Sequence, residues 1–144
     1  MIRGPTELRF HARPRELKHV RAAVKREALA AGCDENAAQD VMLAVDEACQ
    51  NVIRHAYGPE HEGDMVLRIE QQEHTLVISL LDFAPPVDPS KIKPRDLDDV
   101  RPGGLGTYLI QEVMDSAEFV EPPPGCGNLL RMVKRVEGPK RSEG

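Results

Sequence analysis

The sequence predicts an α+β domain, a two-layer α/β sandwich in which a mixed, mostly antiparallel sheet is covered on one face by helices. Short stretches with alternating apolar residues are typical of half-buried strands, and two longer stretches repeat apolar residues at helical spacing. The chain has 144 residues, of which 40% are hydrophobic, enough for one packed domain. We expect a single domain over residues 1–137, followed by a disordered polar tail at 138–144.

Composition argues against two classes of partner. The net charge is −5 with interspersed signs, and aromatic residues make up only 3%, so we expect no nucleic-acid partner. The N-terminus lacks the apolar core of a signal sequence, and the longest apolar-rich run, residues 76–81, is too short to span a bilayer. We therefore expect a cytoplasmic protein without membrane contact.

The cysteines are odd in number and widely spaced, at Cys33, Cys49 and Cys126. Such spacing matches neither a disulfide framework nor a zinc site. We interpret all three as small core residues.

The first predicted elements are a strand at residues 6–12 and a helix that begins at Pro14 and ends at Gly32. Glycine is well suited to the C-terminal cap of a helix. Basic side chains form the solvated face of this helix in the simplest interpretation and a partner-docking face in the alternative. They are Arg15, Lys18, Arg21, Lys25 and Arg26.

A second helix is predicted from Asp34, which can cap it, to about Tyr57, a length of about six turns. Helical spacing places one set of apolar residues toward a core. These residues are Val41, Met42, Val45, Ala48, Cys49, Val52, Ile53 and Ala56.

Three polar residues, Glu47, Asn51 and His55, follow one another at four-residue spacing along the border of this apolar arc. A carboxylate and a carboxamide on one half-sheltered row could hold a hard divalent cation and orient a nucleophile. The alternative interpretation is an ordinary solvated flank of the helix.

Two further strands, at residues 65–70 and 75–82, are separated by a polar connection at 71–74 and predict an antiparallel pair. The second of them ends in Asp82, which would be costly to bury without a hydrogen-bond donor. The last two strands are predicted at residues 117–120 and 129–136.

Residues 83–102 are rich in proline and lose the core periodicity, which indicates a lid, with an interdomain linker as the alternative. Glycines at 103, 104 and 106 then precede an apolar-periodic helix. Backbone amides at such a helix start can receive a phosphate. A flexible hinge is the other interpretation of these glycines.

In this order, the helix with Glu47 and Asn51, the strand ending in Asp82 and the glycine turn at 103–106 resemble the N box and the two glycine boxes of the GHKL, or Bergerat-fold, ATP-binding family. The run 47–57 and the compact size resemble its anti-sigma-factor serine/threonine kinases of the RsbW and SpoIIAB type. The resemblance covers about residues 6–136.

This resemblance implies a role for each matching residue. Glu47 would be the base that takes the proton from a substrate serine hydroxyl, Asn51 would bind Mg²⁺ through its side-chain oxygen, and Asp82 would accept a hydrogen bond from the adenine of ATP. Further residues are implied to line the nucleotide under the lid at 83–102. They are Ala84, Gly103, Gly104, Leu105, Gly106, Thr107 and Asn128.

The resemblance also implies a function. It is that of an ATP-dependent kinase in a bacterial partner-switching system, which forms a homodimer, phosphorylates a STAS-type anti-anti-sigma protein and binds a sigma factor. The first glycine box departs from the family pattern, because residues 82–86 read Asp-Phe-Ala-Pro-Pro. Pro86 removes an amide donor and restricts Pro85. The alternative function is therefore a catalytically weak or inactive nucleotide-binding module that regulates a protein partner by contact.

The catalytic half of a histidine kinase is a third interpretation. It is disfavoured because the sequence offers no additional helical hairpin for a phospho-accepting histidine, and neither His11 nor His19 is followed by an acidic residue.

Overall fold

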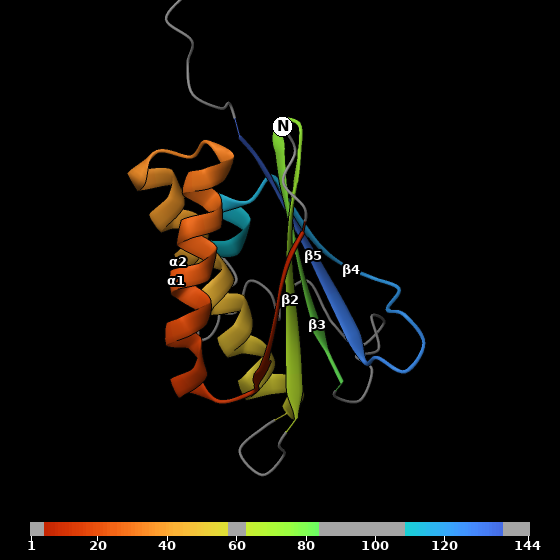
Figure 1. Ribbon diagram of the computed structural model, residues 1–144. Helices are drawn as coiled ribbons and strands as arrows, with labels where there is room; N and C mark the ends of the chain where they lie inside the picture. The colour runs from red at the N-terminus through yellow and green to blue at the C-terminus, as the bar shows by residue number, and fades with distance from the viewer. Residues whose placement is uncertain (1–4, 58–62, 84–108, 137–144) are drawn as a thin grey trace, which may run out of the picture.

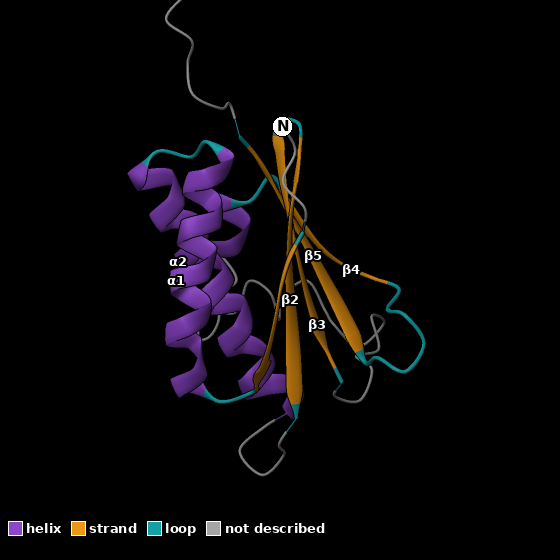
Figure 2. Cartoon of the chain, in the orientation of Figure 1, coloured by secondary structure: helices purple, strands orange, loops and turns teal. Residues whose placement is uncertain are grey.

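The computed structural model describes residues 5–57, 63–83 and 109–136, apart from the side chains of residues 55–57. Its strands form one five-stranded sheet in the order β1-β2-β3-β5-β4, and every neighbouring pair is antiparallel. The described helices all lie on one face of this sheet (Figure 1; Figure 2). The predicted two-layer α+β sandwich is therefore confirmed.

The strands lie close to where the sequence predicted them. Their bounds are Thr6–His11 for β1, Asp64–Gln72 for β2, Thr75–Asp82 for β3, Ser116–Val120 for β4 and Asn128–Arg135 for β5. In the centre of the sheet, Asp82 is in register with Met65 on one side and with Asn128 on the other. The sheet thus aligns the end of β3 with the start of β5.

Both helices of the first half have the predicted caps. A short 3₁₀ turn, η1 (Pro14–Glu16), leads into α1 (Leu17–Ala31), and α1 ends at Gly32, whose φ of 113° favours glycine. At the start of α2 (Glu35–Asn51), an Asp34 side-chain oxygen accepts a hydrogen bond from the Ala37 amide at 2.7 Å. Local cap chemistry thus sets the ends of the α1–α2 connection.

The prediction of one continuous α-helix to Tyr57 is wrong in its last part. The α-helix ends at Asn51, and the segment η2 (Val52–Tyr57) is a π-helix. A π-helix makes wider turns, with i→i+5 hydrogen bonds, and is frequent at functional sites. The periodicity argument assumed 100° per residue throughout, so it could not detect this change.

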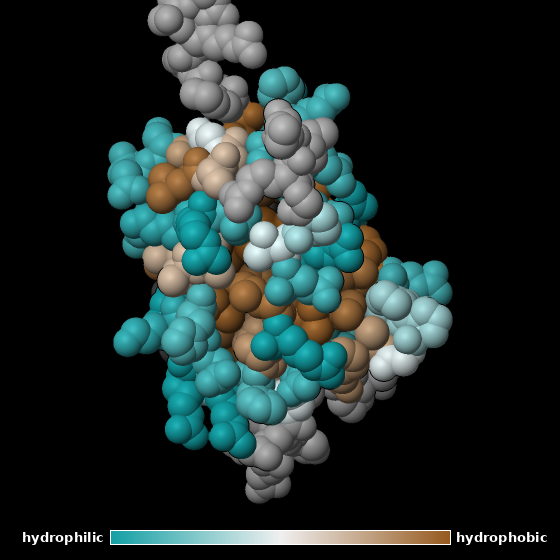
Figure 3. Space-filling model, viewed as in Figure 1, coloured by the Kyte–Doolittle hydropathy of each residue, from teal (hydrophilic) through white to brown (hydrophobic). Residues whose placement is uncertain are grey.

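The predicted apolar face is confirmed by burial for Val41, Val45, Ala48, Cys49 and Val52, while Met42 and Ile53 are partly buried against the core and the side chain of Ala56 lies outside the described residues. The fully buried residues of α2 are Ala38, Val41, Ala44, Val45, Ala48 and Cys49, and they share one core cluster with Met65, Leu67, Ile78, Leu80 and Met132 of the sheet. Burying each large side chain contributes about 1.5–3 kcal/mol. Figure 3 shows hydrophobic residues gathered in the middle of the view, with hydrophilic residues over most of the helix layer.

Residues 109–113 are helical and pack on the same core. Ile110 and Met114 are the buried residues of this segment, while Leu109 and Val113 are only half-buried. The apolar periodicity predicted for the helix after the glycines is therefore confirmed in its described part.

The interpretation of the cysteines is correct for two of the three. Cys49 is completely buried, which raises the pKa of its thiol, and Cys33 packs against the core. Cys126 lies half-exposed in the turn between β4 and β5 and is not part of the core. Cys126 lies in a connection between two strands rather than between the two layers, and its residue type alone could not predict this position.

We predict that Asp34→Ala lowers the free energy of unfolding by about 1 kcal/mol, because α2 loses the acceptor for its first free amides. Urea denaturation followed by circular dichroism measures this change. Asp34→Asn keeps an acceptor and should lose less than half as much; an equal loss in both variants would show that the cap is unimportant.

Candidate functional site

Glu47 and Asn51 lie one turn apart near the end of α2, on the border between its buried face and solvent. The Glu47 side chain is 20% exposed and Asn51 is half-buried. Their neighbours Ala48 and Cys49 are fully buried. The packing of α2 therefore holds both polar side chains at a half-sheltered edge, as the sequence predicted.

A single guanidinium group joins these two side chains. Arg54 Nη2 donates to Glu47 Oε1 at 3.3 Å and to Asn51 Oδ1 at 3.1 Å. A carboxylate oxygen and a carboxamide oxygen thus converge on one cationic group. Oxygen donors of this kind are the ligands that hard divalent cations prefer.

Arg54 was not predicted as a site residue. Its position three residues after Asn51 and seven after Glu47 places it on the same side of a helix, and this spacing beside an acidic residue is the sequence feature that could have identified it.

The opposite flank of α2 is held by another polar cluster. Asp46, which is 9% exposed, accepts hydrogen bonds from Arg21 Nη1 at 2.9 Å and from Gln50 Nε2 at 2.7 Å. Arg21 belongs to α1 and was predicted only as part of a solvated face. The Arg21–Asp46 ion pair links α1 to α2. It therefore opposes a rotation of α2 about its axis, and such a rotation would move Glu47 and Asn51.

The carboxylate of Asp82 is buried at the end of β3, with 2% exposure. It alternates with Ile78 and Leu80, so it lies on the sheet face that the helices cover. Asn128 Nδ2 donates to Asp82 Oδ1 at 3.0 Å, and the Gly127 amide donates to the Asp82 carbonyl at 2.8 Å. The prediction that a buried Asp82 needs a donor is confirmed, and the protein supplies one.

These predicted residues lie toward one end of the sandwich. Figure 1 shows the end of α2, the end of β3 and the start of β5 at the same end of the molecule. Met65, the register partner of Asp82, belongs to the same core cluster as Cys49 of α2 and Val52 of η2. The elements that carry Glu47, Asn51, Asp82 and Asn128 therefore pack on one common core.

The remaining predicted nucleotide-lining residues lie outside the described residues. They are Ala84, Gly103, Gly104, Leu105, Gly106 and Thr107. Of the predicted lid at 83–102, only Phe83 is described; its ring is exposed and lies 5.3 Å from the Arg9 guanidinium carbon. Neither the lid nor the glycine turn is tested by the structure.

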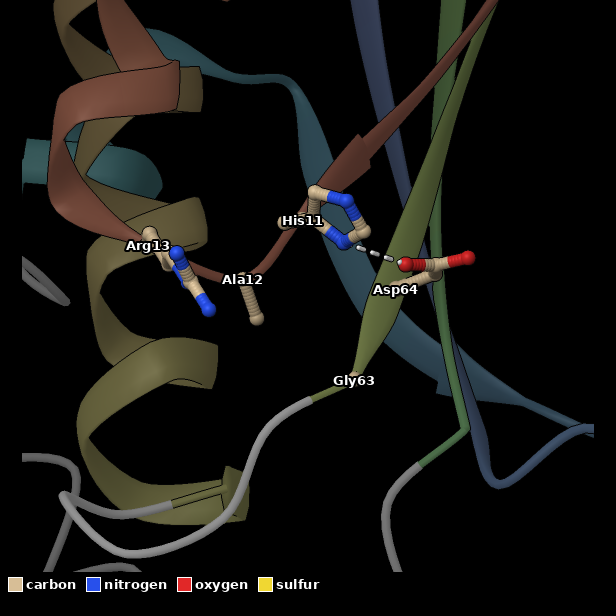
Figure 4. Close-up of a pocket in the computed structure, with 5 residues that line it drawn as sticks. All are labelled: His11, Ala12, Arg13, Gly63 and Asp64. Carbon is tan, nitrogen blue, oxygen red and sulfur yellow. Dashed lines mark ion pairs between the residues drawn. The ribbon is translucent and has the colours of Figure 1, made fainter.

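A hollow of about 250 Å³ lies beside the β1–β2 edge, lined by His11, Ala12, Arg13, Gly63 and Asp64 (Figure 4). Asp64 accepts a hydrogen bond from Arg9 Nε at 2.9 Å, which lowers the pKa of that carboxyl group, and Asp64 also contacts His11 Nδ1. Glu47, Asn51 and Asp82 do not line it. We therefore do not take this hollow for the predicted site.

Within the described part of the chain, no group of three or more histidine, cysteine, aspartate or glutamate side chains could hold a metal ion. Mg²⁺ needs few protein ligands when substrate phosphates supply the others. The Glu47–Asn51 pair therefore fits a cation that arrives with a nucleotide. In the same described residues, no helix is long and apolar enough to cross a membrane.

Comparison with known families matches residues 10–134 to the histidine kinase-like ATPase domain. The chain belongs to the histidine kinase-like ATPase domain family. The matched range contains Glu47, Asn51, Asp82 and Asn128 together with the glycine turn at 103–106. The resemblance stated from the sequence is thereby confirmed.

Relatives within this ATPase family are named protein kinases. Serine-protein kinase RsbW of Bacillus velezensis is 29% identical over 147 residues, spanning 96% of this chain and 89% of the relative. RsbW of Bacillus pumilus is 32% identical over 123 residues, spanning 78% and 75%. Serine/threonine-protein kinase BtrW of Bordetella bronchiseptica is 31% identical over 81 residues, spanning 54% and 57%.

A solved structure supports the fold. The crystal structure of the RsbU and RsbW domains of a Mycobacterium tuberculosis protein has a TM-score of 0.64 and 18% sequence identity. The match covers 96% of this chain and 34% of that longer chain.

We predict that Asn128→Ala lowers the free energy of unfolding by about 1–3 kcal/mol, because the buried Asp82 carboxylate loses a donor. A double-mutant cycle with Asp82→Ala, measured by urea denaturation, isolates the interaction between the two side chains. The double variant should cost less than the two single variants added together. Additive costs would show that the Asp82–Asn128 hydrogen bond contributes nothing.

Proposed function

We propose that this chain is an ATP- and Mg²⁺-dependent protein serine/threonine kinase and anti-sigma factor of a bacterial partner-switching system. Its substrate would be a serine on a STAS-type anti-anti-sigma protein, and a sigma factor would be its second partner in regulating transcription. It would act in the cytoplasm as a homodimer. The names of its relatives, RsbW and BtrW, support the kinase activity.

One observation of the geometry carries this proposal. The side-chain oxygens of Glu47 and Asn51 converge on one cationic group at a half-sheltered edge of α2. Phosphoryl transfer depends mainly on positioning and on charge stabilisation, with little covalent help from the protein. A base and a metal ligand one helical turn apart meet that requirement.

Each residue would then have one task. Bound Mg²⁺·ATP supplies the transferred phosphoryl group and the charge that stabilises it. Asn51 Oδ1 would hold the metal ion, and Glu47 would accept the proton of the substrate hydroxyl. Asp82 would accept a hydrogen bond from the adenine amino group, while Asn128 keeps its carboxylate in place.

The remaining contacts with the nucleotide are proposed from the family pattern. The glycines at 103, 104 and 106, with Leu105 and Thr107, would line the phosphates, and Ala84 would lie near the base.

A second candidate function is a nucleotide-binding module without appreciable catalysis, which regulates its partner by contact. The sequence Asp-Phe-Ala-Pro-Pro at 82–86 favours it, because both family glycines of that box are replaced. Transfer of phosphate from radiolabelled ATP to a partner protein separates the candidates, because this module would bind the nucleotide without transferring its phosphate. Calorimetry with ATP and Mg²⁺ tests whether the chain binds nucleotide at all. Neither binding heat nor a thermal shift is expected if the nucleotide site has degenerated.

We predict that Glu47→Gln reduces phosphate transfer by about 10²–10⁴-fold while nucleotide binding is retained, because the amide cannot take up the proton. The assay uses radiolabelled ATP and STAS proteins encoded by neighbouring genes. Glu70→Gln is the matched control, since Glu70 also accepts a hydrogen bond from an arginine, Arg68, but lies on β2. Transfer that is undiminished in Glu47→Gln would refute the assignment of the base.

A further inference from the structure

Arg54 takes up the two oxygens that the proposed function assigns to chemistry. The same nitrogen, Nη2, lies 3.1 Å from Asn51 Oδ1, the proposed metal ligand, and 3.3 Å from Glu47 Oε1, the proposed base. The positive group at Asn51 Oδ1 makes the contact that a metal ion bound there would make.

The helix geometry explains how Arg54 reaches both oxygens. Side chains on a helix lean toward its N-terminus, so Arg54 extends back over Asn51 toward Glu47. Its backbone belongs to the π-helical segment η2, which begins directly after Asn51. The Arg54 side chain is 45% exposed, against 20% for Glu47, so the guanidinium can move into solvent without disturbing the core.

We propose that Arg54 competes with the metal ion. Without nucleotide, its guanidinium stands in for Mg²⁺ at Asn51 Oδ1 while it also pairs with Glu47 Oε1, and it must release Asn51 Oδ1 before Mg²⁺·ATP binds. The proposal rests on the proposed function, because it needs Asn51 to be a metal ligand. A guanidinium and a metal ion in contact with the same Asn51 oxygen would repel each other, which favours one occupant at a time.

The opposite role for Arg54 predicts the opposite result. If its guanidinium instead bound the phosphates, its removal would weaken nucleotide binding. Competition predicts tighter binding, because the metal then no longer displaces an ion pair. The shared atom Asn51 Oδ1 favours competition, since the contact is made with the proposed metal ligand itself.

The test is calorimetric titration of Mg²⁺·ATP into the wild-type chain and into Arg54→Met, which keeps the side chain long and removes its charge. We expect the dissociation constant of Mg²⁺·ATP to be at least about threefold lower for Arg54→Met than for the wild type, which corresponds to the free energy of a partly exposed ion pair. The Mg²⁺ concentration that gives half-maximal ATP binding should fall by a similar factor. Arg54→Lys, which keeps the charge, should stay closer to the wild type.

Arg68→Met is the matched control. Arg68 also bridges two side-chain carboxylates, Glu7 at 3.5 Å and Glu70 at 3.3 Å, and its side chain is 46% exposed. Removing its charge should leave the dissociation constant of Mg²⁺·ATP and the half-maximal Mg²⁺ concentration unchanged. Equal or weaker Mg²⁺·ATP binding by Arg54→Met would overturn this proposal alone, whereas an absence of ATP binding by the wild type would overturn the proposed function as well.

Discussion

Burial of one face of α2 against the sheet is the constraint on which the rest of the structure depends. Val41, Val45, Ala48 and Cys49 are at most 1% exposed, so the rotation of the helix about its axis is fixed by a close-packed interior. Glu47 then lies at the border of the core, where it keeps partial contact with water. A carboxylate buried deeper in the core without hydrogen-bond partners would lose its hydration at a large cost in free energy.

The sandwich accommodates buried polar side chains because they have partners. Asp46 is satisfied by Arg21 and Gln50 on one flank of α2. At the end of the sheet, the register of β3 with β5 brings the Asn128 amide to the buried Asp82 carboxylate. These two clusters fix where α2 and β3 present their polar groups, so the positions of these groups follow from the packing of the described helices and strands.

Much of this arrangement could be predicted because it follows from local patterns. Every described strand was predicted within a few residues, β1 and β2 from their alternation, and Asp34 and Gly32 located the α1–α2 connection by cap chemistry. The π-helical turn at Val52–Tyr57 could not be predicted, because periodicity assumes one turn geometry. The interactions of Arg21 and Arg54 were missed, because composition alone assigns such side chains to the solvated surface. The strand order β1-β2-β3-β5-β4 was not predicted either, because it depends on pairing between residues far apart in the sequence. The roles of the glycine turn at 103–106 stay predictions.

A crystal structure with Mg²⁺ and a non-hydrolysable ATP analogue tests the central claim most directly. The account predicts the metal ion on the side-chain oxygen of Asn51, the adenine amino group within hydrogen-bonding distance of Asp82, and the Glu47 carboxylate facing the terminal phosphate. A nucleotide bound elsewhere, or a metal ion held away from Asn51, would contradict it.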